Sequence, residues 1–271
     1  MFMTLSQTPS PLSSSDIPED RQLLALALKL CREASDIILE IRERGFVTSK
    51  KSDMSPVTEA DQKAEQHILA GLRAAVPSIP VIAEEEMAAG IGPDAVGDIF
   101  WLVDPLDGTR EFAEGRKDFT VNIGLIRRDR AVLGAMALPA WGQFYSGGEG
   151  IGAFRHDANG DHAIHVRKVP ADGLTVFASR HHGNAPELAE YLNGRPIADV
   201  HNIGSAVKFV RIAEGVGDLY PRLGPTMEWD TAAPQAIVEA AGGQITLFDG
   251  KPLRYGKTGW KNPHFVCVGQ I

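Results

Sequence analysis

Cysteine, basic residues and long apolar runs are all scarce in this chain. Only two cysteines occur among its 271 residues, Cys31 and Cys267, and each lies in apolar sequence. Two isolated thiols exclude a disulfide framework and a zinc-ligand spacing, and they favour core packing in a reducing compartment, the cytoplasm. Lysine and arginine number 27 against 35 aspartates and glutamates, and the formal net charge is −8. This excess of negative charge argues against a nucleic acid polymer as a partner.

The chain also lacks an apolar segment of transmembrane length, which leaves only peripheral association with the cytoplasmic face of a membrane open. Residues 1–15 are rich in Ser, Thr and Pro but have neither the basic nor the apolar region of a secretory signal, and we predict a disordered lead-in. Residues 16–271 are long enough for a sizeable core. We expect one unit with an N-terminal α+β half (about 16–170) and a C-terminal α/β half (about 171–271).

The most informative stretch runs from Ile99 to Phe112. Its first residues, Ile99 to Val103, form an apolar run typical of a buried strand. Pro105 has no N–H group, so we expect the strand to stop there. Asp104 and Asp107 lie three residues apart in the predicted turn, where two carboxylates can converge on one point.

Gly108 and Thr109 complete this turn. Glycine lets the backbone approach a ligand closely, and if a helix follows, the N–H groups of both residues favour an anion. Carboxylates that collect hard cations beside amides that hold a phosphate are typical of metal-dependent phosphoryl chemistry. A plain Asp-Gly turn between two elements is the alternative.

Two helices are expected before this stretch. Apolar residues at helical spacing predict the first, which begins near Asp16 and ends at Gly45. The lysine-rich stretch that follows is predicted to be a loop. Thr58 and Asp61 resemble a capping pair that opens the second helix, Ala60 to Val76. Asp61 therefore lies in a first helical turn, where it either takes part in a site or only complements the helix dipole.

A short apolar strand, Pro80 to Ala83, runs directly into the acidic residues 84–86. A carboxylate at the C-terminal end of a strand lies where open α/β sheets bind ligands, and a solvated acidic turn is the alternative. Residues 87–98 are predicted to form a loop. After Phe112 the pattern predicts an antiparallel meander of short strands at Thr120–Ile126, Ala131–Pro139, Gln143–Ser146, Gly152–Arg155 and Ala163–Val166.

The C-terminal part alternates strands and helices. Strands are predicted at Leu174–Ala178, Leu219–Leu223, Gln244–Phe248 and Phe265–Val268, and helices at Pro186–Leu192, from Gly204 onward and at Glu228–Ala241. The adjacent histidines 181 and 182 favour a polar contact with a substrate over a shared metal ion. Asp230 lies in the first turn of the last helix, where a capping function is the default.

Two of these motifs together resemble a known family. Asp104-Pro-Leu-Asp-Gly-Thr109 and Trp229-Asp-Thr-Ala-Ala233, in this order and about 120 residues apart, are similar to the two signatures of the inositol monophosphatase superfamily. The likeness spans nearly the whole chain after residue 15, and within the superfamily it is greatest to the 3′(2′),5′-bisphosphate nucleotidases of the CysQ type. The resemblance implies a layered α-β-α-β-α sandwich and a magnesium-dependent phosphomonoesterase.

The resemblance also implies a function for individual residues. It implies that two or three Mg²⁺ ions are bound by Glu84, Asp104, Asp107 and Asp230 and by the backbone carbonyl of Leu106. It implies that Asp61 and Thr109 orient the attacking water, with Glu84 as a third catalytic residue. It implies that the amides of Gly108 and Thr109 hold the reacting phosphate, and that Lys51 approaches either this phosphate or a third metal ion. Leu106, Asp107 and Asp230 are further implied substrate contacts. Oxygen ligands without histidine or cysteine suit magnesium and argue against zinc.

The implied substrate is 3′-phosphoadenosine 5′-phosphate, hydrolysed to AMP and phosphate, with the 5′-phosphosulfate as a second substrate, in sulfur assimilation or nucleotide recycling. A second phosphate needs cationic partners. Lys208 and Arg222, with Ser205 and His182 nearby, are the candidates, and an exposed surface position is the alternative for Lys208.

Two further functions stay open. The first is an inositol-phosphate or other sugar-phosphate phosphatase on the same scaffold. The second is a catalytically weak nucleotide or metal sensor, although the complete set of carboxylates with Thr109 argues against lost activity. The resemblance also implies a homodimer, since dimers are common in the superfamily.

Overall fold

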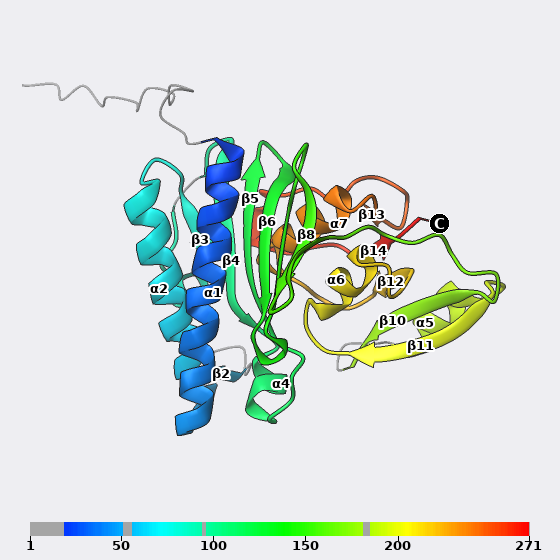
Figure 1. The fold of residues 1–271 in the computed structure, drawn as a ribbon, viewed down its shortest axis with the longest axis horizontal. Helices are drawn as coiled ribbons and strands as arrows, with labels where there is room; N and C mark the ends of the chain where they lie inside the picture. The colour runs from blue at the N-terminus through cyan, green and yellow to red at the C-terminus, as the bar shows by residue number, and fades with distance from the viewer. Residues whose placement is uncertain (1–18, 51–55, 94–95, 181–184, 271) are drawn as a thin grey trace, which may run out of the picture.

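The computed structural model describes residues 19–50, 56–93, 96–180 and 185–270, in which helices and two β-sheets alternate in layers (Figure 1). The helices of these layers are α1 (Asp20–Arg44), α2 (Glu59–Ala75), α5 (Ala185–Leu192), α6 (Val207–Ala213) and α7 (Ala232–Ala240). Helices α1 and α2 cover one face of a seven-stranded sheet, and α6 and α7 lie between this sheet and a five-stranded one. Tyr191 and Leu192 of α5 pack on the five-stranded sheet and form the last layer. The predicted α-β-α-β-α sandwich is therefore confirmed.

The seven-stranded sheet has the order β3-β4-β5-β6-β7-β8-β9. Its strands are β3 (Val81–Ala83), β4 (Ile99–Asp107), β5 (Thr120–Arg127), β6 (Arg130–Leu138), β7 (Gln143–Gly148), β8 (Gly152–Asp157) and β9 (Gly160–Ala163). Strand β3 runs parallel to β4, and all later neighbours are antiparallel, as the predicted meander requires. The last predicted strand, Ala163–Val166, is wrong, because the chain turns back earlier and β9 ends at Ala163.

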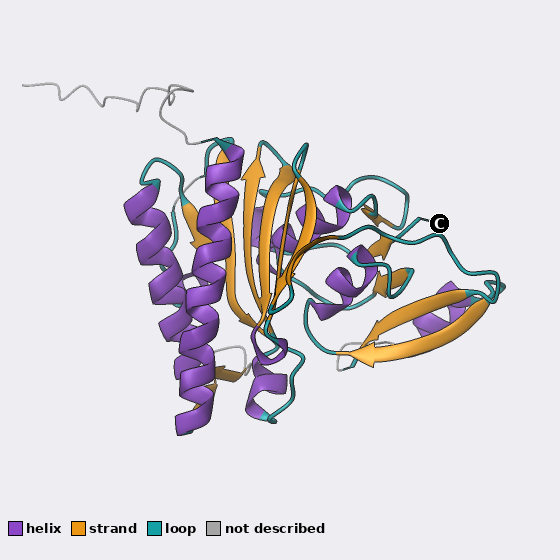
Figure 2. Ribbon diagram, viewed as in Figure 1, coloured by secondary structure: helices purple, strands orange, loops and turns teal. Residues whose placement is uncertain are grey.

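The five-stranded sheet has the order β11-β10-β12-β14-β13. Figure 2 draws the strands of both sheets in orange. Its strands are β10 (Leu174–Ser179), β11 (Ile197–Ile203), β12 (Leu219–Arg222), β13 (Gln244–Leu247) and β14 (Phe265–Val268). Strand β10 is parallel to β11 and β12, and β14 is antiparallel to β12 and β13. The edge strand β11 was not predicted, because its largely exposed residues give no apolar run.

Apolar spacing explains how α1 and α2 pack. Both helices bury the face that their spacing predicts, and Trp101 and Val103 of β4 join the same core. Gly45, with φ +84°, ends α1 as expected. The N-terminal lead-in and the expected helix start at Asp16 lie outside the described residues, in which the helix begins at Asp20. None of the helices in the described ranges is both long and apolar enough to cross a membrane.

Helix α7 lies unusually close to the seven-stranded sheet because glycines face it. A Cβ atom added at Gly124 would lie 2.6 Å from the backbone nitrogen of Ala233, and one at Gly134 would lie 2.2 Å from its carbonyl oxygen. Only glycine fits between strand and helix at such distances. This contact brings the chain just before α7, which carries Asp230, against strands β4 and β5.

Strand β4 does not stop at Pro105, contrary to the prediction. It continues to Asp107, with an irregularity in which Asp104 pairs with Asn122 and Asp107 pairs with Thr120. Two residues, Pro105 and Leu106, therefore lie opposite one residue of β5, as in a β-bulge. The missing N–H of proline falls inside this bulge, where no ladder hydrogen bond is lost.

Shorter elements connect these layers. They are the paired strands β1 (Thr48–Lys50) and β2 (Pro56–Thr58), the helices α3 (Glu84–Ala88) and α4 (Thr109–Ala113), and the 3₁₀ turns η1 (Pro139–Trp141), η2 (Glu228–Asp230) and η3 (Thr258–Trp260). The loop predicted from Lys50 is thus wrong at that residue, which pairs with β2, and residues 51–55 of it lie outside the described residues. The loop predicted from residue 87 begins after Ala88. Asp230 lies in η2, so it does not belong to the first turn of α7 as predicted.

Candidate active site

A cavity of about 310 Å³ lies where the two sheets meet, at the C-terminal ends of β4, β10 and β12. Ten predicted site residues line it: Glu84, Asp104, Leu106, Asp107, Gly108, Thr109, Ser205, Lys208, Arg222 and Asp230. Asp61 does not line the cavity but contacts Thr109, which does. Lys51 and His182 lie outside the described residues. The fold thus gathers residues from five separate regions of the sequence.

Parallel pairing of β3 with β4 brings the first two carboxylates together. Ala83, the last residue of β3, pairs with Val103 of β4, so Glu84 and Asp104 each follow one residue of this pair. Side chains at the carboxyl ends of adjacent parallel strands meet at one edge of the sheet. Glu84 is also the first residue of α3, so the acidic run is not the solvated turn of the alternative interpretation.

Asp107 links the motif of β4 to the start of α6. Its Oδ2 accepts a hydrogen bond from the hydroxyl of Ser205 at 2.8 Å and another from the backbone N–H of Ala206. Ser205 has a φ of +55°, which is uncommon for a residue with a side chain. The carboxylate therefore fixes Ser205 and the start of α6, the helix that carries Lys208.

Asp230 faces the negative charge of the other carboxylates. Burial raises its pKa well above the usual range, and the charges of Asp107 and Glu84 raise it further. Its Oδ2 accepts the N–H of Met227 at 2.9 Å, so it also has the predicted capping function, at η2. Carboxylates that repel one another in a shared cavity form a donor set for a hard cation.

The donor set fits magnesium in chemistry, although the carboxylates are not gathered into a finished coordination group. No group of three or more His, Cys, Asp or Glu side chains in the described ranges has an arrangement that could hold a metal ion. Asp107 bonds to Ser205 and Ala206 instead, and Oδ1 of Asp104 accepts the N–H of Leu106 at 3.1 Å.

Asp61 has two functions in the structure. Its Oδ2 accepts both the N–H and the hydroxyl of Thr58, at 2.7 Å each, and so completes the predicted capping box of α2. Its Oδ1 accepts the hydroxyl of Thr109 at 2.8 Å. The side chain is 1% exposed. The two interpretations of Asp61, as a cap and as a partner within a site, are therefore compatible.

Gly108 makes the turn between β4 and α4. Its φ is +92°, and a Cβ atom there would lie 2.9 Å from the carbonyl oxygen of Asp118 and 3.1 Å from Cβ of Ser205. Helix α4 begins at the next residue, as the anion-binding prediction requires. A residue with a side chain would both strain the turn and push Ser205 away.

Lys208 is buried, so the alternative of an exposed lysine is wrong. The residue is 2% exposed, and its Nζ donates to the carbonyls of Ile203 and Ser205 and lies 4.9 Å from the ring centre of Tyr220. Burial lowers the pKa of Lys208 to about 7, against the opposing effect of Asp107. Its ammonium group is therefore held inside the cavity wall, close to its charge transition.

Arg222 is the second cation of the cavity wall. One terminal nitrogen donates to the hydroxyl of Ser179 at 3.0 Å and the other to the carbonyl of Pro225 at 2.6 Å. Its Nε is buried and has no hydrogen-bond partner among the described residues. An arginine fixed in this way presents a planar cation to a ligand with little loss of side-chain freedom.

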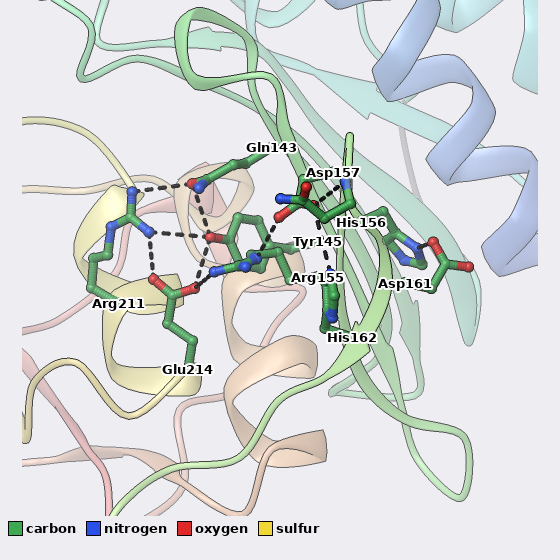
Figure 3. Close-up of polar contacts among 10 residues, drawn as sticks. Gln143, Tyr145, Arg155, His156, Asp157, Asp161, His162, Arg211 and Glu214 are labelled. Carbon is green, nitrogen blue, oxygen red and sulfur yellow. Dashed lines mark hydrogen bonds and ion pairs between the residues drawn. The ribbon is translucent and has the colours of Figure 1, made fainter.

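A polar network on the far end of α6 holds that helix in place (Figure 3). Arg211 pairs with Glu214 and donates to the hydroxyl of Tyr145 and to the side chain of Gln143, each at 3.2 Å. The Tyr145 hydroxyl donates to Glu214 at 3.0 Å, and Arg155 of β8 also pairs with Glu214. These residues were missed from the sequence, because no local pattern joins α6 to β7 and β8.

Comparisons with known proteins agree with the fold. The family model described as "Inositol monophosphatase family" matches residues 19–264. The 3′(2′),5′-bisphosphate nucleotidase CysQ of Shigella flexneri is 40% identical over 246 residues, which cover 90% of this chain and 98% of that relative. The crystal structure of CysQ from Bacteroides thetaiotaomicron has a TM-score of 0.77 at 31% identity and covers 93% of this chain and 98% of its own. An inositol monophosphatase from Zymomonas mobilis has a TM-score of 0.75 at 27% identity, with coverage of 92% and 93%. The chain belongs to the inositol monophosphatase family.

Proposed function

We propose that this chain is a magnesium-dependent phosphomonoesterase that hydrolyses 3′-phosphoadenosine 5′-phosphate to AMP and phosphate, with the 5′-phosphosulfate as a second substrate. The name of the relative from Shigella, a 3′(2′),5′-bisphosphate nucleotidase, supports a nucleotide with two phosphates as the substrate class. The reaction breaks the bond between phosphorus and the 3′ oxygen of the ribose. The water oxygen bonds to phosphorus, and a proton ends on the 3′ oxygen.

The observation that carries this proposal is the charge of the cavity. Carboxylates line one part of it, and the buried cations Lys208 and Arg222 line another. A substrate with a single phosphate would leave one of these buried charged groups without an ionic partner, which is unfavourable. With Mg²⁺ held at the carboxylates, a bisphosphate nucleotide would offer one phosphate to that part of the cavity and the other to Lys208 and Arg222, so it suits both parts.

Glu84, Asp104, Asp107 and Asp230, with the carbonyl of Leu106, are the residues that would hold two or three Mg²⁺ ions. Bound magnesium supplies a water molecule of lowered pKa and positive charge near the leaving oxygen. The all-oxygen donor set supports magnesium over zinc. Lys51 and His182 are further proposed contacts of the substrate.

Thr109 and Asp61 would orient the attacking water. Because Asp61 accepts the Thr109 hydrogen, the lone pairs of that hydroxyl are left to accept a hydrogen bond from water. Asp61 is itself held by Thr58, so the hydroxyl has little freedom to rotate away. The N–H groups of Gly108 and Thr109 would hold the reacting phosphate at the start of α4. These residues act by orientation, so no phosphorylated protein is required.

Phosphate release from two substrates tests the proposal. 3′-Phosphoadenosine 5′-phosphate and inositol 1-phosphate are each incubated with the chain in Mg²⁺, in EDTA, and with the variant Asp107→Asn. We expect fast release from the nucleotide in Mg²⁺, and little release in EDTA or from the variant.

Preference for inositol 1-phosphate would keep the metal site but overturn the assignment of Lys208 and Arg222. Equal release in EDTA would overturn the metal-dependent mechanism. No release from any monoester would favour a sensor. We also propose that both halves of the chain form one catalytic unit. We further propose a homodimer, and the molar mass from light scattering would check it.

A further inference from the structure

Glu65 is a buried carboxylate that the proposed chemistry does not use. It lies on α2, one helical turn after Asp61, and is 4% exposed. Its Oε2 accepts the backbone N–H of Glu85 at 2.7 Å, and its Oε1 accepts that of Glu86 at 2.8 Å. Both oxygens are thus directed at the first turn of α3.

Helix α3 needs such a partner because it has no cap of its own. The first N–H groups of a helix have no acceptor inside the helix, and the residue before α3, Ala83, has no side-chain acceptor. Glu65 supplies two acceptors from a different helix. It therefore caps α3 through tertiary structure.

This cap fixes the backbone on one side of Glu84, the first residue of α3. On the other side, Ala83 is held by pairing with Val103 in the sheet. Glu84, a predicted metal ligand, is thus held between a strand and a capped helix. Removal of the Glu65 cap would loosen the backbone on the helix side of Glu84 and would leave the pairing of Ala83 with Val103 intact.

One face of α2 consequently holds two parts of the site. Asp61 reaches Thr109 at the start of α4, and Glu65 reaches α3 one turn further along. A rigid helix with both carboxylates sets where Glu84 lies relative to the pair proposed to orient water. Arg73, near the end of α2, adds an exposed bidentate contact to Glu86 at 2.9 and 2.7 Å.

We propose that Glu65 is a positioning residue that holds Glu84 in the cavity and thereby sets the affinity of the site for Mg²⁺. This inference rests on the proposed function, in which Glu84 is a metal ligand. A purely structural function for Glu65 is the competing explanation, and it predicts lower stability with unchanged metal affinity.

The first experiment uses Glu65→Gln in the full chain. The amide keeps the size of the side chain but presents N–H₂ to one of the two backbone N–H groups, so one hydrogen bond is lost. We expect the Kd for Mg²⁺, measured by calorimetry without substrate, to rise about 10- to 100-fold, the range for partners that orient metal ligands. The Mg²⁺ concentration for half-maximal phosphate release should rise in parallel.

Two control variants separate positioning from general stability. Asp218→Asn changes a carboxylate that is also buried and accepts a backbone N–H, from Thr175 at 2.8 Å, but does not line the cavity. It should lower the melting temperature and leave the Kd for Mg²⁺ unchanged. Arg73→Gln removes only the exposed contact to α3 and should raise that Kd far less than Glu65→Gln does.

An unchanged Kd for Mg²⁺ in Glu65→Gln, with a lowered melting temperature, would overturn the inference and leave Glu65 a structural residue. If Glu65→Gln does not fold, hydrogen exchange in the unaltered chain tests whether the Glu65 cap is coupled to Mg²⁺ binding. Because coupling is reciprocal, Mg²⁺ should slow exchange of the Glu85 and Glu86 amides, and unchanged exchange would refute the coupling. An unaltered chain that binds no Mg²⁺ and releases no phosphate would instead contradict the proposed function.

Discussion

The hydroxyl of Thr109 donates to Oδ1 of Asp61 at 2.8 Å, although 48 residues separate the two in the sequence. Oδ2 of the same carboxylate closes the first turn of α2 through Thr58. The position of the Thr109 hydroxyl in the cavity is therefore set by a helix cap, and local stability and the proposed catalysis share one side chain.

Substitution at this pair should lower turnover far more than stability. We expect Asp61→Asn and Thr109→Ala each to lower kcat about 10²- to 10⁴-fold, since the water loses its orienting acceptor. The double variant should be little worse than either single one, because the two residues act as a unit. The loss of unfolding free energy for Asp61→Asn should be about 1 kcal/mol, the typical contribution of a cap. Thr109→Ser keeps the hydroxyl and is the control, and equal losses for Ser and Ala at this position would contradict the prediction.

Magnesium should stabilise the fold by relieving repulsion among carboxylates. The pKa of Asp230 is raised by burial and by the charges of Asp107 and Glu84, so a bound cation should raise the melting temperature by about 2–4 °C for each kcal/mol it contributes. In EDTA, Asp230→Asn should melt higher than the unaltered chain, and it should gain little from Mg²⁺. Thermal unfolding followed by circular dichroism measures both effects. The exposed substitution Asp249→Asn is the control, and a lower melting temperature of Asp230→Asn in EDTA would rule out the repulsion.

Lys208 should make stability rise with pH in the alkaline range. Its pKa is lowered to about 7 in the fold, from 10.5 for an unburied lysine. Between these values the unfolded chain binds more protons than the folded chain, so the free energy of unfolding should rise by up to about 1.4 kcal/mol per pH unit from this residue. Below about pH 7 the fold must hold a buried charge, and the contribution is flat.

Lys208→Met should remove this slope, as measured by denaturant unfolding from about pH 6 to about pH 10. Lys63→Met, at an exposed position of α2, should leave the slope unchanged. Parallel stability curves for the unaltered chain and Lys208→Met would show that Lys208 does not titrate in this range.

Arg222→Lys should weaken binding of the nucleotide more than binding of a single phosphate. The guanidinium is fixed by Ser179 and Pro225, and a lysine cannot reproduce its planar donor geometry. We expect KM for 3′-phosphoadenosine 5′-phosphate to rise about 10- to 100-fold, equivalent to about 1.4–2.8 kcal/mol. Release of phosphate from inositol 1-phosphate by the same variant is the internal control, and equal effects on both substrates would contradict a second-phosphate function for Arg222.

Local sequence patterns determined most helices and strands of this protein and the turn that carries Asp104, Asp107 and Gly108. The capping box of Thr58 and Asp61, the strand before Asp104, and the turn at Gly108 depend on residues only a few positions apart. Such features follow from spacing and backbone preference, which are properties of short segments. Likewise, the glycine at position 45 marked where α1 ends.

The tertiary structure decided those features that depend on segments far apart in the sequence. The bulge lets β4 pass Pro105, because the register with β5 places the missing N–H where no bond is needed. Lys208 is buried rather than exposed because α6 packs between the two sheets.

The assembly of the site was decided in the same way. Pairing of β3 with β4 and packing of α7 on glycines bring Glu84 and Asp230 to the cavity, and Glu65 meets α3 only after α2 has packed beside β3. Sheet register and helix packing join residues that are far apart along the chain. The periodicity of one segment specifies which face is buried but not which partner covers it.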